Sequence, residues 1–224
     1  VKALHVEAEE SARALARTRS DADPKVRAEL QAKAKAAKDE LNRRAQVAKQ
    51  TAGAEAKAEK GTHLHALSEL ADQGLDLPKN ISFEDVIDID AYNSIANGFK
   101  IVHMEKLVVC DLIGTAGTPD RVSEWHGEAA LVAPDGTRFE PGDGQRLITD
   151  LKTGTVEYGG LKMAMQLGIY SRSDLYSHET GEREPLEGVN LKWGIIMNVP
   201  AGRGEGALYW VDLELGWEAV LIAG

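Results

Sequence analysis

The sequence predicts an α/β or α+β domain with a mixed sheet, preceded by a helical arm. Residues 1–60 are rich in Ala, Lys, Glu, Arg and Gln and hold almost no aromatic residues, a composition that favours helix. From residue 99 the apolar period changes to two, which is typical of strands, and a helical period returns over 159–174. An order of helices, a strand meander, a helix and further strands indicates a mixed sheet flanked by helices.

The arm, residues 1–60, is expected to hold two helices, the first over about 2–19. Asp23-Pro24 has the form of an N-cap followed by proline at the first helical position, so the second helix should run from 24 to the mid-50s. Its apolar residues are mostly alanine, with Leu30, Leu41 and Val47 widely spaced among them. Such a helix buries little by itself, so we expect an arm, a partner-binding helix or a partly disordered segment.

Residues 61–224 are expected to form the main domain. Gly61 should restart the helical pattern over 62–73, Leu77-Pro78 should break the chain, and Ser82 with Asp85 should cap a helix that runs to about Ala96. Strands are expected near 100–109, 114–125, 128–133, 146–152, 191–199 and 207–213. Three further features are a hairpin turn at Pro134-Asp135-Gly136, the helix over 159–174 and a short closing helix from Trp217 to Ile222.

Charge is distributed unevenly along the chain, whose net charge is -10. Residues 1–60 hold 14 Lys/Arg and 10 Asp/Glu, a net +4, and the remainder holds 12 against 26, a net -14. The main domain is therefore strongly acidic, which argues against tight non-specific DNA binding by that domain alone.

Cysteine and hydropathy exclude several other classes. The single cysteine, Cys110, excludes an internal disulfide and any four-cysteine zinc or iron–sulfur site, and it fits a reducing cytoplasm. The chain has no run of about 18 apolar residues, so we expect no membrane span. The N-terminus of this sequence lacks the pattern of a secretory signal, so we expect a cytoplasmic protein.

Candidate catalytic residues lie on two predicted strands. Alternate side chains of a strand share a face, so Asp150 and Lys152 should point the same way while Leu151 points into the core. Asp120, from the strand segment Gly117-Thr118-Pro119-Asp120-Arg121, can meet them. Two neighbouring carboxylates repel unless a cation lies between them, and hard oxygen ligands suit Mg²⁺ or Mn²⁺. Lys152 could orient or help deprotonate a metal-bound water.

An Asp-x-Lys tripeptide by itself is more often a solvated strand face. Here the flanks favour a buried strand, because Leu147 and Ile148 are apolar and Thr153-Gly154 ends the strand abruptly.

Two helical pairs accompany these strands. His65 and Glu69 are four residues apart, as are Gln166 and Tyr170, so each pair shares a helix face. The first pair by itself is more often a surface contact. The second offers neutral hydrogen bonds to a phosphate backbone, although two amphipathic residues at a helix edge are common.

Taken in order, these segments resemble the RecB-like nucleases of the PD-(D/E)XK superfamily. The family pattern is Gly-x-x-x-His-x-x-x-Glu on a helix, Gly-x-x-Asp, apolar-x-Asp-x-Lys-x-Gly on a strand, and Gln-x-x-x-Tyr on a helix. The matching segments are Gly61…His65…Glu69, Gly117-Thr118-Pro119-Asp120, Ile148-Thr149-Asp150-Leu151-Lys152-Thr153-Gly154 and Gln166…Tyr170. Each motif is weak, but four in the right order over about residues 61–175 are specific. The resemblance implies a restriction-endonuclease-like core with a mixed central sheet.

The same resemblance implies a role for each matching residue. His65, Asp120 and Asp150 would ligate Mg²⁺ or Mn²⁺, with the backbone carbonyl of Leu151 as a further ligand. Lys152 would activate or position the attacking water. Gln166 and Tyr170 would touch DNA or buttress the site, and Glu69 would support the ligands. The implied function is a deoxyribonuclease, an exonuclease more than an endonuclease, in recombination, repair or phage DNA metabolism.

Departures from the family and two alternatives remain. The iron–sulfur members need four cysteines, so this chain resembles the lineage without a cluster, and its composition is similar to that of actinobacterial phage proteins, which would place it in a host cytoplasm. A helicase motif is missing from the sequence, so a helicase or recombination partner would be a separate chain, and the N-terminal helices could form an oligomer. One alternative is a catalytically inactive nuclease fold that binds DNA or serves assembly. The other is a helical interaction module whose motif matches are accidental.

Overall fold

The computed structural model describes residues 24–51, 53–127, 131–132, 138–139 and 141–223. The chain divides into two compact units between Ala58 and Glu59, and each is described by itself. No helix in these described ranges is long and apolar enough to cross a membrane.

The long helix of the first unit, α2 (Pro24–Thr51), begins at the proline where the sequence predicts it. It ends earlier than the mid-50s, because Gly53 takes a left-handed φ of 68° and its N–H bonds the carbonyl of Gln50. Exposed ion pairs join Glu40 to Arg43 and Arg44 along the helix surface. The helix expected over 2–19 lies outside the described residues.

The next two helices precede the first strand in the sequence. Helix α3 (Ala54–Asp72) runs through Gly61, so the prediction that a helix restarts there was wrong. Helix α4 (Phe83–Ala96) confirms the predicted cap: the Ser82 hydroxyl accepts the N–H of Asp85, and the Asp85 carboxylate accepts the N–H of Ser82. These reciprocal bonds satisfy two N–H groups that the first helical turn cannot satisfy itself.

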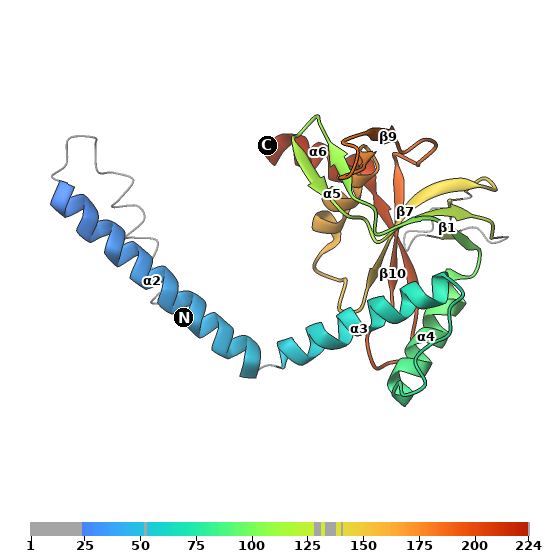
Figure 1. Ribbon diagram of the computed structural model, residues 1–224, viewed down its shortest axis with the longest axis horizontal. Coiled ribbons are helices and arrows are strands. Elements are labelled where there is room, and N and C mark those ends of the chain that lie inside the picture. Colours follow the sequence, from blue (N-terminus) through green and yellow to red (C-terminus); the bar gives the residue numbers. More distant parts are fainter. Residues whose placement is uncertain (1–23, 52, 128–130, 133–137, 140, 224) are drawn as a thin grey trace. The chain divides into compact units, whose positions relative to one another are not determined.

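The central sheet has five strands in the order β1-β4-β7-β10-β11. Their bounds are Phe99–Met104 (β1), Arg121–Trp125 (β4), Gln145–Lys152 (β7), Trp193–Asn198 (β10) and Ala207–Asp212 (β11). Only β7 and β10 pair in parallel, while the other three neighbouring pairs are antiparallel. The predicted mixed sheet is therefore present (Figure 1).

Two predicted strands were wrong as single elements. The segments expected over 100–109 and 114–125 each divide between the central sheet and a four-stranded sheet of order β3-β2-β8-β9. The first divides because Glu105 turns the chain with a φ of 48° and its N–H bonds the carbonyl of Asp120. The strands of the second sheet are β2 (Val108–Cys110), β3 (Thr115–Gly117), β8 (Asp174–Tyr176) and β9 (Arg183–Pro185).

Strands β8 and β9 were not predicted, since three residues are too few to display a period. Strand β5 (Leu131–Val132) lies within the region expected as a strand over 128–133, and it pairs with β6 (Arg138–Phe139), which was not predicted. The hairpin turn expected at Pro134-Asp135-Gly136 lies outside the described residues.

Two apolar clusters of buried residues pack against the central sheet. On one face, Leu147 and Leu151 of β7 pack with α3 and α4 residues. On the other face, Ile148 packs with α5 (Gly160–Tyr170) and α6 (Leu213–Ala223). The alternation of these residues along β7 is the period of two that the sequence displays. Helix α5 ends earlier than the predicted 174, and α6 begins before Trp217.

Helices α5 and α6 approach closely at Gly216, where an added Cβ would lie 2.1 Å from the backbone oxygen of Ala164. We therefore expect Gly216→Ala to lower the free energy of unfolding by about 1–3 kcal/mol, because the helices must move apart. Urea titration followed by circular dichroism measures this loss. Gly160→Ala is the matched control: a Cβ there meets nothing within 4 Å, so it should be neutral or stabilising by up to about 1 kcal/mol. Equal effects of the two substitutions would contradict the packing described.

Candidate active site

Helix α3 approaches the end of β7 at Gly61. An added Cβ at this buried glycine would lie 2.5 Å from Oγ1 of Thr153, so a larger residue would require the Thr153 side chain or the helix to move. One turn further along, α3 carries His65, half-buried, and then Ser68, fully buried. The close approach at Gly61 therefore brings the first predicted motif against the third.

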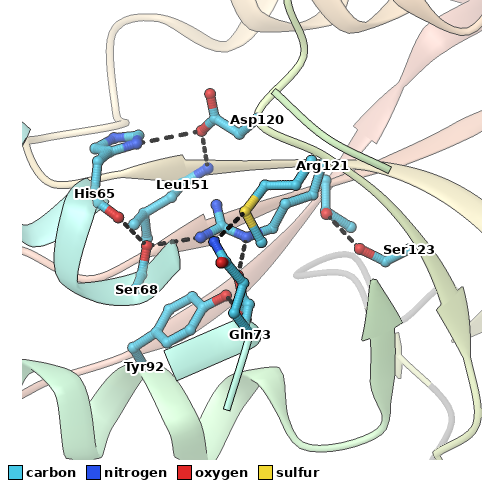
Figure 2. Close-up of polar contacts among 11 residues, drawn as sticks. His65, Ser68, Gln73, Tyr92, Asp120, Arg121, Ser123 and Leu151 are labelled. Carbon is cyan, nitrogen blue, oxygen red and sulfur yellow. Dashed lines mark hydrogen bonds and ion pairs between the residues drawn. The ribbon is translucent and has the colours of Figure 1, made fainter. Parts of the chain in front are cut away.

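Asp120 lies in the bend before β4 and not on a strand, which corrects the sequence prediction. The preceding residue, Pro119, has no N–H for a ladder bond. Oδ2 of Asp120 accepts the backbone N–H of Leu151 at 2.8 Å and lies 3.6 Å from Nδ1 of His65 (Figure 2). A single carboxylate oxygen therefore links α3 to the middle of the Asp150-Leu151-Lys152 segment.

Asp150 and Lys152 form an ion pair, so they lie on the same side of β7 as predicted, while Leu151 is fully buried. Asp150 is 3% exposed, and its Oδ2 is the oxygen that faces the Lys152 ammonium. Burial raises the pKa of Asp150 to about 6, the charge of Asp120 raises it as well, and Lys152 opposes both. Its carboxylate is thus held in an environment that disfavours the charged form.

The pKa of His65 shifts downward, in contrast to that of Asp150. Burial lowers its pKa, the negative charge of Asp120 raises it, and the positive charges of Arg121 and Lys152 lower it again. Because the net shift is downward, the imidazole is neutral near pH 7 and keeps a lone pair that could bind a cation.

Two residues that the sequence analysis missed support the site. Arg121 is 1% exposed, and it donates from Nε to Asp72 and from Nη2 to Ser68 (Figure 2). Asn198 on β10 donates from Nδ2 to the carbonyls of Lys152 and Gly154, at 2.7 and 2.8 Å, and so holds the end of β7. An arginine that follows a motif aspartate, or a polar residue ending an apolar strand, is the only sequence signal that could have indicated them.

A third missed residue is Glu105, whose backbone N–H bonds the carbonyl of Asp120 at 3.0 Å. Burial raises the pKa of its carboxyl group, and the charges of Asp120 and Glu69 raise it further. Glu69 is half-buried on α3, and its charge acts on both His65 and Glu105. The site therefore holds more negative charge than the motif residues alone predict.

Gln166 and Tyr170 lie side by side on α5, where Nε2 of Gln166 donates to the Tyr170 hydroxyl at 3.0 Å. The Tyr170 ring fills the space beside Gly117, because an added Cβ on that glycine would lie 2.6 Å from Cε1 of the ring. The fourth motif is thus in contact with the second. Tyr170 is 9% exposed, which fits a buttress for β3.

The predicted ligands are brought together only in part. Across the residues with described placement, no three His, Cys, Asp or Glu side chains are grouped so that they could hold a metal ion. His65 meets Asp120, but the Asp150 carboxylate pairs with Lys152, and the Asp120 oxygen nearest His65 accepts the Leu151 N–H. In this arrangement His65, Asp120 and Asp150 therefore do not form one three-residue group. The physical reason is that two carboxylates repel, so Asp150 takes the lysine as its counter-ion.

Comparison of the chain with protein-family models gives no match, and comparison with curated proteins gives none either.

The raised pKa of Asp150 predicts a pH dependence of stability in metal-free protein. A carboxyl group whose pKa is higher in the folded than in the unfolded state stabilises the fold below its unfolded pKa, near 4. That contribution disappears as the pH rises through about 6. Wild type should therefore lose on the order of 1–3 kcal/mol between pH 5 and pH 8 relative to Asp150→Asn, which has no titrating group there. Urea titrations of both proteins at the two pH values, in EDTA, measure the difference. Parallel pH profiles would refute the assignment.

Proposed function

We propose that this protein is a metal-dependent deoxyribonuclease with a PD-(D/E)XK core of the RecB-like type, hydrolysing DNA phosphodiester bonds as an exonuclease in recombination, repair or phage DNA metabolism. The observation that carries the proposal is that contacts join all four motif segments. Gly61 packs on Thr153, His65 lies beside Asp120, Asp120 bonds Leu151, and Gly117 packs on Tyr170. Accidental motif matches, the second of the two alternatives, would have no reason to converge.

The chemistry of the proposed ligands, one imidazole and two carboxylates, suits a divalent cation. The Asp150 carboxylate is buried, the charge of Asp120 acts on it, and Lys152 is its counter-ion. A divalent ion would offset the charges of both carboxylates. His65, Asp120 and Asp150 would hold the ion, and the Leu151 carbonyl is the fourth proposed ligand. A bound Mg²⁺ or Mn²⁺ supplies charge stabilisation for the phosphate oxygens and a lowered pKa for bound water.

Lys152 has the role of handling the proton or orienting the water. Its ammonium group pairs with Asp150, and its backbone carbonyl accepts from Asn198, so its place at the end of β7 is fixed. The side chain is one-third exposed and can reach solvent or substrate. Gln166 and Tyr170 would contact the DNA backbone or hold β3 in place.

The second candidate function is binding or assembly without cleavage, by a nuclease fold that lost catalysis. The acidic charge after residue 60, a net -14, and the incomplete grouping of ligands favour it. Metal binding and DNA digestion separate the two candidates.

We propose that α2 binds DNA outside the candidate site. Further proposed partners are a helicase, a recombination protein or a second copy of the chain. The described side chains of Lys33, Lys35 and Lys38 are exposed on α2. Phosphate contacts by lysines release counterions from DNA, which supplies the attraction that the acidic main domain lacks.

Substitutions at the site should separate binding from chemistry. Lys152→Ala should abolish hydrolysis but retain the ion, because lysine is not a ligand. Asp150→Ala and Asp120→Ala should abolish both, and activity should fall by several orders of magnitude. His65→Ala should be milder with Mg²⁺ than with Mn²⁺, which accepts nitrogen more readily. The measurements are digestion of end-labelled linear and circular DNA, and calorimetric titration of the ion.

Lys79→Ala, at an exposed loop lysine, is the control and should cut as wild type does. Activity that persists in the Lys152→Ala and Asp150→Ala variants would show that the site lies elsewhere.

The arm assignment has its own test. Replacing Lys33, Lys35 and Lys38 by Gln should weaken DNA binding and reduce the slope of log affinity against log salt by roughly one for each phosphate that is no longer neutralised. Cleavage at saturating DNA should stay unchanged, because none of the residues proposed for the chemistry is altered. Fluorescence anisotropy at several salt concentrations gives the slope. Lys79→Gln with Lys192→Gln, two exposed lysines of the main domain, is the matched control. An unchanged slope in the triple variant would remove α2 from the DNA interface.

A further inference from the structure

Arg121 is an arginine that the fold buries completely, at 1% exposure. Its Nε donates to Oδ2 of Asp72 at 2.5 Å, its Nη2 donates to Oγ of Ser68 at 2.7 Å, and its guanidinium lies 5.4 Å from the ring centre of Tyr92. The Tyr92 hydroxyl in turn donates to Oδ1 of Asp72 at 2.7 Å. We call Ser68, Asp72 and Tyr92 the Arg121 socket (Figure 2).

The socket joins three elements around the candidate site. Ser68 and Asp72 are on α3, Tyr92 is on α4, and Arg121 is the first residue of β4. His65, Ser68 and Asp72 follow one another at helical spacing, so they form one stripe of α3. This stripe contacts two consecutive residues: His65 meets Asp120, while Ser68 and Asp72 hold Arg121.

A hydroxyl group connects the socket directly to a proposed ligand. Ser68 accepts the hydrogen bond from Arg121 and donates its own to the backbone carbonyl of His65 at 2.7 Å. The guanidinium is therefore one hydroxyl away from the residue that carries the imidazole. On its other side it is one peptide bond away from Asp120.

Stability alone does not account for a buried charge here. Desolvating a guanidinium and a carboxylate costs free energy that their attraction only partly offsets, and apolar residues of similar volume commonly stabilise a core as well or better. What an apolar replacement lacks is the fixed, planar set of donors that sets the distance between two elements.

We propose that Arg121 is a positioning residue, which fixes α3 against the start of β4 so that His65 and Asp120 meet at one point. The proposal rests on the proposed function only where it concerns the ion that this pair would bind. The contact between α3 and β4 is a property of the protein without any ion.

The test replaces the socket by apolar groups. The triple variant Asp72→Leu, Tyr92→Phe, Arg121→Met leaves no unpaired charge, and Ser68 keeps its bond to His65. We expect the melting temperature of the triple variant to equal or exceed that of wild type. Arg121→Met alone should lower the melting temperature, because it leaves the Asp72 carboxylate buried without its counter-ion. Calorimetric titration of Mn²⁺ should show affinity in the triple variant weaker by about tenfold or more, as when groups that orient metal ligands are removed. If Arg121 had a purely structural role, a triple variant as stable as wild type would also bind Mn²⁺ as tightly as wild type.

Ser123→Ala is the matched control. Ser123 lies on β4 two residues after Arg121, is buried, and forms its side-chain hydrogen bond with Thr149 of β7 rather than with the Arg121 socket. It should bind Mn²⁺ within about twofold of wild type, because the ligand-orienting bonds are intact. If the triple variant does not fold, the Mn²⁺ affinity of Ser68→Ala is the deciding measurement. This substitution removes only the hydroxyl that joins Arg121 to the His65 carbonyl, and the affinity should again be weaker than that of wild type. Affinity equal to wild type in the deciding variant overturns the proposal.

A second measurement separates this inference from the proposed function. The Leu151 N–H is bonded to Asp120, so its hydrogen exchange reports the position of that carboxylate without any ion. If wild type binds no Mn²⁺, the metal-dependent function fails, and exchange then decides the positioning role. Faster exchange at Leu151 in the triple variant, with unchanged exchange in Ser123→Ala, supports it. Equal protection of Leu151 in all three proteins refutes it.

Discussion

The antiparallel pairing of β4 with β7 is the constraint on which the candidate site depends. Its register places Arg121 opposite Thr149, so the chain just before β4 passes beside Leu151. Pro119 ends the ladder, and the Asp120 carboxylate takes the place of a backbone acceptor for the Leu151 N–H. Since Leu151 is flanked by Asp150 and Lys152, a shift of register by one residue would turn the acid and the lysine to the opposite face.

Burial and neighbouring charges shift the pKa values of the acidic side chains around the candidate site. The negative charges of Asp120, Glu69 and Asp150 raise the pKa of Glu105, and that of Asp120 raises the pKa of Asp150. The positive charge of Arg121 opposes both shifts, and Lys152 opposes the shift of Asp150. The carboxyl groups of Asp150 and Glu105 are both shifted toward the protonated form, while His65 is shifted toward the neutral form. Burying several acidic side chains close together is unfavourable, because their charges are desolvated and repel one another. A divalent ion would offset these charges, and this is the physical reason for the proposed metal dependence.

Two glycines show why the motif segments need small residues as well as reactive ones. Gly61 leaves room for Thr153, and Gly117 leaves room for the Tyr170 ring. In both places the conflict of an added Cβ is with a side chain from another motif, so each glycine joins two segments that are distant in the sequence. Neither backbone takes a left-handed φ there, and close approach is therefore the reason for glycine.

Local features were determined by the sequence alone. The period of two over 146–152 predicted that Asp150 and Lys152 share a side of a buried strand, and Ser82 with Asp85 predicted a helix cap, because side-chain direction and capping depend on neighbours within a few residues. Tertiary structure alone decided where the chain turns and what meets across it. The division of two predicted strands between sheets, the contact of His65 with Asp120 and the burial of Arg121 join residues up to about fifty positions apart. No local period encodes such contacts, because they exist only once α3, β4 and β7 pack around one core.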